Sequence, residues 1–120
     1  MVSIKAQIVA ALSAIATIEL SEEYPQNWSN FTKDKVTYTE ENNSVHTLTD
    51  DTEKRTLMRF RIDVWSKSYT TDTCILIDNV MRQLGLFRIS AVDANDPKYA
   101  HKVMRYEGIY EYDTNRMYKS

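Results

Sequence analysis

The stretch TLMRFRIDVW, residues 56–65, decides the fold of this chain. Apolar and polar side chains alternate along it, which is the period of a β-strand that buries one face. We therefore predict a strand over residues 56–65, whose core face consists of Met58, Phe60, Ile62 and Val64. The opposite face carries Arg59, Arg61 and Asp63, and Trp65 follows them.

Apolar residues at helical spacing flank this strand on both sides. Isoleucine, leucine and alanine recur every three or four positions over residues 3–18, which predicts an amphipathic helix. Cys74, Ile77, Met81 and Leu84 repeat the pattern and predict a second helix over about 71–84. Gly85 then occupies the position where a left-handed residue commonly ends a helix.

Three further strands complete the expected sheet. They are predicted over residues 35–40, 86–93 and 102–112, with a turn at residues 95–97 before the last one. The resulting order, α-β-β-α-β-β, predicts an α+β domain over residues 1–120, with a mostly antiparallel sheet and two helices packed on one face.

The polar segment 40–55 allows two interpretations. It is either a hairpin arm that turns at Asn42-Asn43 or a loop that becomes ordered only against a partner. The sequence leaves both open, since Val45 and Leu48 are its only apolar residues.

Composition disfavours several classes of function. The two glycines and two prolines leave no room for a phosphate-binding loop, and the net charge of −2 shows no basic stripe for nucleic acid. No run reaches the ~18–20 apolar residues that cross a membrane. We therefore expect neither specific nucleic-acid binding nor a membrane partner.

Residues capable of catalysis or metal binding are few and scattered. His46 and His101 are far apart in the sequence and lack the spacing of a zinc site, so we interpret both as surface residues. The single Cys74 falls on an apolar stripe and is expected in the core. We predict no catalytic residue, cofactor or metal. Tyr106, Tyr110 and Tyr112 could stack RNA bases, but Glu107 and Glu111 lie between them, and a core rim or subunit interface explains these tyrosines equally well.

Three segments together resemble the tail-terminator or tail-completion proteins of long-tailed bacteriophages and phage-tail-like particles. The first is the N-terminal amphipathic helix, and the second is FRIDVWSKSYTTDTCILIDNVMRQLGL, residues 60–86, in which a strand enters a helix after a Ser/Thr-rich turn. The third comprises RISAVDAND and HKVMRYEGIYEYD, residues 88–96 and 101–113. The resemblance follows the element order over most of residues 3–113, whereas residues 40–55 match no part of the family pattern.

This resemblance implies a structural virion protein without enzymatic activity. Such a subunit assembles as a ring, commonly a hexamer, at the head-proximal end of the tail tube, where it ends tube polymerisation and joins the tail to the neck or head. Its implied partners are other copies of itself, the tail tube protein and a neck or head-connector protein, in a virion assembled in the bacterial cytoplasm.

A ring requires that two different patches of the same chain meet. The candidate interface residues are Arg59, Arg61, Asp63, Trp65 and Tyr69, together with His46 and Leu48 of segment 40–55. For Trp65 a second interpretation stays open, in which the indole covers the helix–sheet junction of its own subunit.

Two other functions remain compatible with the sequence. One is a head-closure or connector subunit of the same machinery, because these small neck proteins share the element order. The other is a small dimeric α+β ligand-binding or enzymatic domain, which would need a pocket that brings polar groups such as His46, His101 or Cys74 into use.

Overall fold

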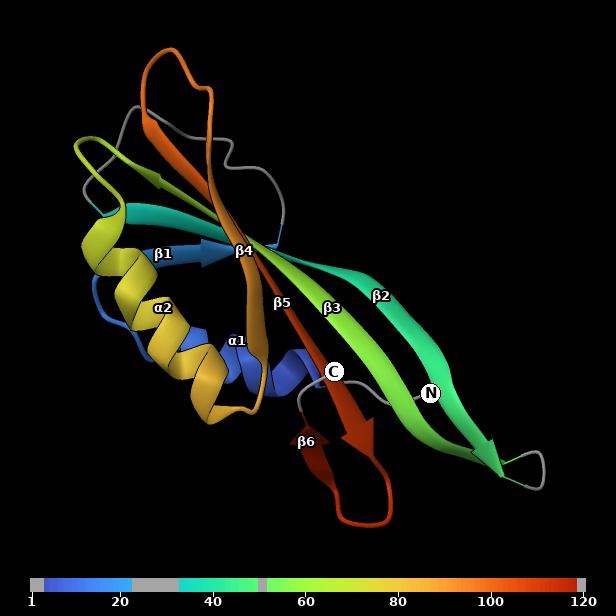
Figure 1. Cartoon of the computed structure of the whole chain (residues 1–120). Coiled ribbons are helices and arrows are strands. Elements are labelled where there is room, and N and C mark those ends of the chain that lie inside the picture. Colours follow the sequence, from blue (N-terminus) through green and yellow to red (C-terminus); the bar gives the residue numbers. More distant parts are fainter. Residues whose placement is uncertain (1–3, 23–32, 50–51, 119–120) are drawn as a thin grey trace.

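The computed structural model describes residues 4–22, 33–49 and 52–118 (Figure 1). Its elements are α1 (Lys5–Ser13), β1 (Ile18–Ser21), β2 (Asp34–Thr49), β3 (Thr52–Ser66), α2 (Thr71–Gln83), β4 (Phe87–Ala94), β5 (Ala100–Glu111) and β6 (Arg116–Tyr118). The strands described form one sheet in the order β1-β2-β3-β5-β4. The short strand β6 pairs with the C-terminal end of β5, which β4 does not reach. The α+β class is therefore confirmed.

The predicted order α-β-β-α-β-β is wrong because it lacks β1 and β6. The first helix ends at Ser13 rather than at residue 18, and Ile18 begins β1, which pairs with β2 in parallel. Ile15 and Ile18 fit the helical period, but a strand of four residues is too short for its own period to show. The sheet is thus mixed, although its other pairings are antiparallel.

The core lies between the helices and one face of the sheet. As predicted, Met58, Phe60, Ile62 and Val64 are fully buried on β3. Both helices cover this face and lie side by side (Figure 1). The helices contribute Ile4, Ile8, Leu12, Cys74, Ile77 and Met81, and the neighbouring strands contribute Val36, Tyr38, Met104 and Tyr106.

The described parts of segment 40–55, residues 40–49 and 52–55, pair as the two strands of a hairpin arm, as one of the two interpretations held. Its turn was predicted in the wrong place, because Asn42 and Asn43 lie within β2, at a bulge after Glu40. The ladder between β2 and β3 continues to the pair Thr49–Thr52. The pairing of β5 with β3 ends at Arg55 and Glu111, so the outermost part of the arm is two-stranded. Figure 1 shows the arm running past both helices, in a molecule that measures 53 × 26 × 23 Å.

The second helix and its end agree with the sequence pattern. α2 spans Thr71–Gln83, and Gly85 follows with a φ of +86°. The amide of Gly85 donates to the Arg82 carbonyl at 2.9 Å and the amide of Leu86 to the Met81 carbonyl at 3.0 Å, which is the hydrogen-bond pattern of a Schellman cap. The predicted turn at residues 95–97 is also present, since the Asp96 carboxylate accepts the amides of Lys98 and Tyr99. No helix in the described ranges is long and apolar enough to cross a membrane.

Candidate assembly surface

The sheet face opposite the helices, which we call the outer face, is crossed by ion pairs. Arg59 of β3 lies beside Glu107 of β5, and its Nη2 is 2.6 Å from Glu107 Oε2. Arg55 and Glu111 form an equivalent pair at 2.9 Å nearer the arm. Both arginines remain partly exposed, so the glutamates hold the guanidinium groups in place without removing them from the surface.

A nearly buried carboxylate, that of Asp63, organises the next part of this face. Arg61 Nε donates to Asp63 Oδ1 at 2.7 Å and Arg61 Nη2 donates to Oδ2 at 2.9 Å. The hydrogen bonds to Asp63 raise the pKa of the Arg61 guanidinium. His101 Nε2 lies 3.1 Å from the same Oδ2, so Asp63 connects Arg61 of its own strand to a histidine of β5. The outer edge of Arg61 stays available to a partner.

Trp65 is covered within its own chain. Its side chain is 3% exposed and stacks on the His101 ring, with the ring centroids 4.3 Å apart. His101 is itself largely covered, which corrects its interpretation as a surface residue. Tyr69, four residues further on, is 70% exposed and borders a hollow formed with Thr70 and Tyr99. Trp65 and Tyr69 were both predicted at the interface, and only Tyr69 exposes its ring.

The arm carries the remaining candidate residues. His46 is exposed, as interpreted from the sequence, and Leu48 and Val45 are 56% and 54% exposed. Within the arm, β2 pairs with β3 around Arg55. His101 pairs with Trp65, which lies ten positions further along β3. At ~3.3 Å per residue these sites lie roughly 30 Å apart. The structure thus gathers Arg59, Arg61, Asp63 and Trp65 on one face and places His46 and Leu48 at a distance.

The three residues that the sequence named for a possible enzyme lie in different parts of the fold, although His101 lines the hollow at Tyr69 together with Asp93 and Lys102. Cys74 lies on the core-facing side of α2, where burial raises the pKa of its thiol. His101 is on the outer face of the sheet and His46 is on the arm. Within the described ranges, no three His, Cys, Asp or Glu side chains gather as a possible metal site.

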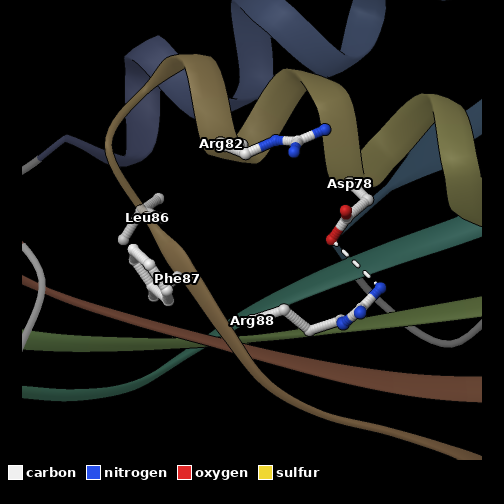
Figure 2. Close-up of a pocket in the computed structure, with 5 residues that line it drawn as sticks. All are labelled: Asp78, Arg82, Leu86, Phe87 and Arg88. Atoms are coloured by element: carbon white, nitrogen blue, oxygen red, sulfur yellow. Dashed lines mark ion pairs between the residues drawn. The ribbon is translucent and has the colours of Figure 1, made fainter.

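A hollow between α2 and β4, which we call the α2–β4 hollow, escaped the sequence analysis. Its volume is about 160 Å³, and Figure 2 shows its lining residues, Asp78, Arg82, Leu86, Phe87 and Arg88. Arg88 Nη1 is 3.4 Å from Asp78 Oδ1, and the hydroxyl of the buried Tyr106 donates to the same oxygen at 2.9 Å. Burial, and then the bond to Asp78, raise the pKa of Tyr106. No sequence signal identified this site, because it depends on where a helix and a strand come to lie.

Strand β4, which borders this hollow, is unusually exposed. It lies at the end of the strand order, pairs with β5 alone among the described strands, and has a bulge between Arg88 and Ser90. Its large apolar side chains Phe87, Ile89 and Val92 are all exposed. An edge strand with exposed apolar residues is typical of a surface that another chain covers.

The sequence matches no protein-family model and no curated protein.

Proposed function

We propose that this chain is a structural virion protein of the tail-terminator kind. It assembles as a ring, hexameric in this proposal, at the head-proximal end of a tail tube, ends polymerisation of the tube and joins the tail to the neck or head. The observation that carries the proposal is the arm, which projects past the helices and exposes Val45 and Leu48 near its end.

The arm supports assembly because no described helix packs on its outermost part, which is held by the pairing of its two strands and, near Glu53 and Lys54, by Tyr112 and Asp113. A two-stranded ribbon in water is marginally stable without packing against other elements. Val45 and Leu48 are just over half exposed, so complete burial by a partner would gain roughly half of the 1.5–3 kcal/mol of a fully exposed side chain, about 1 kcal/mol each. A neighbouring subunit or the tail tube supplies that burial.

The outer face supports the proposal through its polar chemistry. Glu107 and Asp63 hold Arg59 and Arg61 in fixed positions, and both guanidinium groups are partly exposed. Charged groups that are already ordered set the register of a contact at small entropic cost, and arginine is enriched at interface hot spots. Arg59 and Arg61, with the exposed Tyr69, are the residues of the body that we assign to contacts with a second copy or the tube.

Ring closure accounts for the end-capping role. When unlike patches of identical subunits meet, the assembly becomes a filament unless the rotation closes it into a ring. A closed ring on the tube leaves no open site for the next tube subunit, and its other side is available to the neck or head-connector protein. No catalytic chemistry is needed for this function.

The proposal is tested by mixing the purified chain with tail tube protein encoded in the same genome. Native mass spectrometry and negative-stain electron microscopy should show rings, alone or on tube ends, and tubes should stop lengthening when the chain is added. The matched variant Val45→Asp/Leu48→Asp should leave the fold intact but reduce ring formation.

Two outcomes count against the proposal. If the chain stays monomeric with tubes present, the proposed ring is wrong. If it binds the head portal but not tube ends, the function is that of a connector subunit instead.

A further inference from the structure

We propose that the α2–β4 hollow receives the end of the arm from a second copy of this chain. The inference rests on the proposed ring function and deepens it by naming both sides of the contact between subunits. One side is the arm around Val45 and Leu48, and the other is the surface formed by Phe87, Arg82 and Arg88 (Figure 2).

The hollow suits an aliphatic side chain in size and character. Its volume of about 160 Å³ is close to the ~150 Å³ of a cavity that accommodates benzene. The side chain of Phe87 is exposed at its rim, and Leu86, which also lines the hollow, is almost completely buried. A leucine from another chain would bury apolar surface on both sides, which is the dominant favourable term in association.

The charges of the two surfaces are complementary. The hollow is lined by two arginines and one aspartate, and Asp78 is already engaged by Tyr106 and Arg88. The arm, residues 40–55, contains five acidic and two basic residues in its sequence. Both basic residues pair with acids of the same chain, Lys54 with Asp113 and Arg55 with Glu111. Of the acids, Glu41 pairs with Arg105 and Glu53 accepts the Tyr112 hydroxyl, so the sequence still leaves the arm a smaller excess of negative charge for Arg82 and Arg88.

The two surfaces belong to different parts of the fold, as a head-to-tail contact requires. The arm continues β2 and β3 past the helices (Figure 1), whereas the hollow lies between α2 and the edge strand β4 (Figure 2). Each chain then uses its arm on one neighbour and offers its hollow to the other, and repetition of this contact builds the ring.

Chemical cross-linking tests this contact directly. In a Cys74→Ala background, the variants Leu48→Cys and Phe87→Cys each carry one exposed thiol and are mixed in equal amounts with a short bismaleimide. The mixture should give cross-linked dimers that neither variant gives alone, and a chain carrying both substitutions should give a ladder that ends at the size of the ring. Thr39→Cys, at an exposed position on β2, replaces Phe87→Cys as the control and should not cross-link to Leu48→Cys.

The charge contribution is tested with two variants of equal charge change on α2. Arg82→Gln should weaken self-association by about two- to fivefold, the effect of losing one exposed ion pair, when measured by analytical ultracentrifugation. Gln83→Glu also lowers the charge by one, at the neighbouring exposed position, and should leave association unchanged.

The outcomes separate this inference from the proposed function. Rings without cross-linking between positions 48 and 87, or with equal cross-linking of the Thr39→Cys control, would overturn the arm-to-hollow contact and leave the ring proposal standing. Specific cross-links in dimers that never form rings would support the contact and overturn the ring. Failure of both measurements rejects both.

Discussion

Trp65 illustrates how a single side chain can be assigned from its surroundings. The sequence left two roles open, an anchor between subunits or a cover within one subunit. With 3% of its surface exposed and its ring stacked on His101, the indole is buried before any partner arrives. The exposed neighbour Tyr69 is better placed to contact another chain.

We therefore expect Trp65→Ala to destabilise the isolated chain. Truncating a buried tryptophan typically lowers the free energy of unfolding by about 3–5 kcal/mol, since apolar burial is lost and a void is left. Urea unfolding followed by circular dichroism, at a concentration where the chain is monomeric, measures the change. Tyr69→Ala is the control, and its effect should stay within about 0.5 kcal/mol. If Trp65→Ala is as stable as the control, the indole does not stabilise the monomer and its role as a subunit anchor is restored.

Tyr106 gives the fold a predictable dependence on alkaline pH. Burial and the hydrogen bond to Asp78 raise its pKa in the folded chain above the ~10 of an unfolded tyrosine. The folded state thus favours the neutral phenol. This contribution is fully present below pH ~10 and is lost as the pH rises above that value, where the unfolded chain releases the proton more readily.

Tyr106→Phe should remove this pH dependence together with one hydrogen bond. At pH 8 the variant should be less stable than the unsubstituted chain by about 0.5–1.5 kcal/mol, the net worth of a typical hydrogen bond. Above pH ~10 the difference should shrink by about 1.4 kcal/mol per pH unit. Urea unfolding of both proteins between pH 8 and 11 makes the comparison, and parallel stability curves would show that Tyr106 does not carry the effect.

At the scale of elements, the central strand and the second helix could be predicted because their patterns are long. Apolar and polar residues alternate through seven positions around Phe60, from Met58 to Val64. The seam from Cys74 to Leu84 ends at a glycine that does adopt a left-handed conformation. β1 could not be predicted, since Ile18 fits the preceding helical period and the strand has four residues. The arm has no apolar period of its own, and its strands are defined by pairing between β2 and β3.

The candidate surface was predictable in part, because the alternation along β3 is long enough to be recognised. Alternation along β3 places Arg59, Arg61 and Asp63 on one face, but their partners Glu107 and His101 lie 48 and 38 positions away from Arg59 and Asp63. Which strand neighbours β3 is decided by the packing of the whole sheet. The α2–β4 hollow depends on the same packing, so its residues carried no signal in the sequence.

Met117 of β6 lies against both Gly85, just after α2, and Gly108 of β5. A side chain would be tolerated differently at these two glycines. A Cβ at Gly85 would lie 2.8 Å from the Met117 Cβ, and the backbone there has a φ of +86°. A Cβ at Gly108 would meet the Met117 Sδ at 2.7 Å, but this atom is near the end of a flexible side chain, and no positive φ is involved. The clash at Gly108 is therefore easier to relieve than the clash at Gly85.

We expect Gly85→Ala to cost more stability than Gly108→Ala. The first variant should lose at least about 1–2 kcal/mol from the left-handed backbone alone, and the contact with Met117 adds to this. Adding Met117→Ala should largely rescue Gly108→Ala but not Gly85→Ala, where the backbone conformation remains unfavourable. Thermal unfolding of the four variants measures this order, and equal losses at both glycines would contradict it.

The whole molecule divides into a packed body and a projecting arm. Both helices and the buried apolar residues lie in the body, whereas the arm gives the molecule much of its 53 Å length. Because the two parts share β2 and β3 but not the hydrophobic core, they should contribute to different properties. We expect the core to determine the stability of the monomer and propose that the arm determines association.

Shortening the arm tests this division. We would replace residues 46–55 with Asn-Gly. This two-residue turn is suited to antiparallel strands and joins Val45 to its cross-strand partner Thr56. Adding Val45→Thr removes the remaining exposed aliphatic residue of the arm. The shortened chain keeps every core residue, so its urea unfolding should remain cooperative and occur at a similar denaturant concentration. Native mass spectrometry should show a monomer at concentrations where the full chain forms rings. Rings that persist without the arm would place the assembly contacts on the outer face alone, whereas a chain that no longer folds would show that the arm supports the body. The expected result, a folded monomer, requires that the arm act between chains rather than within one.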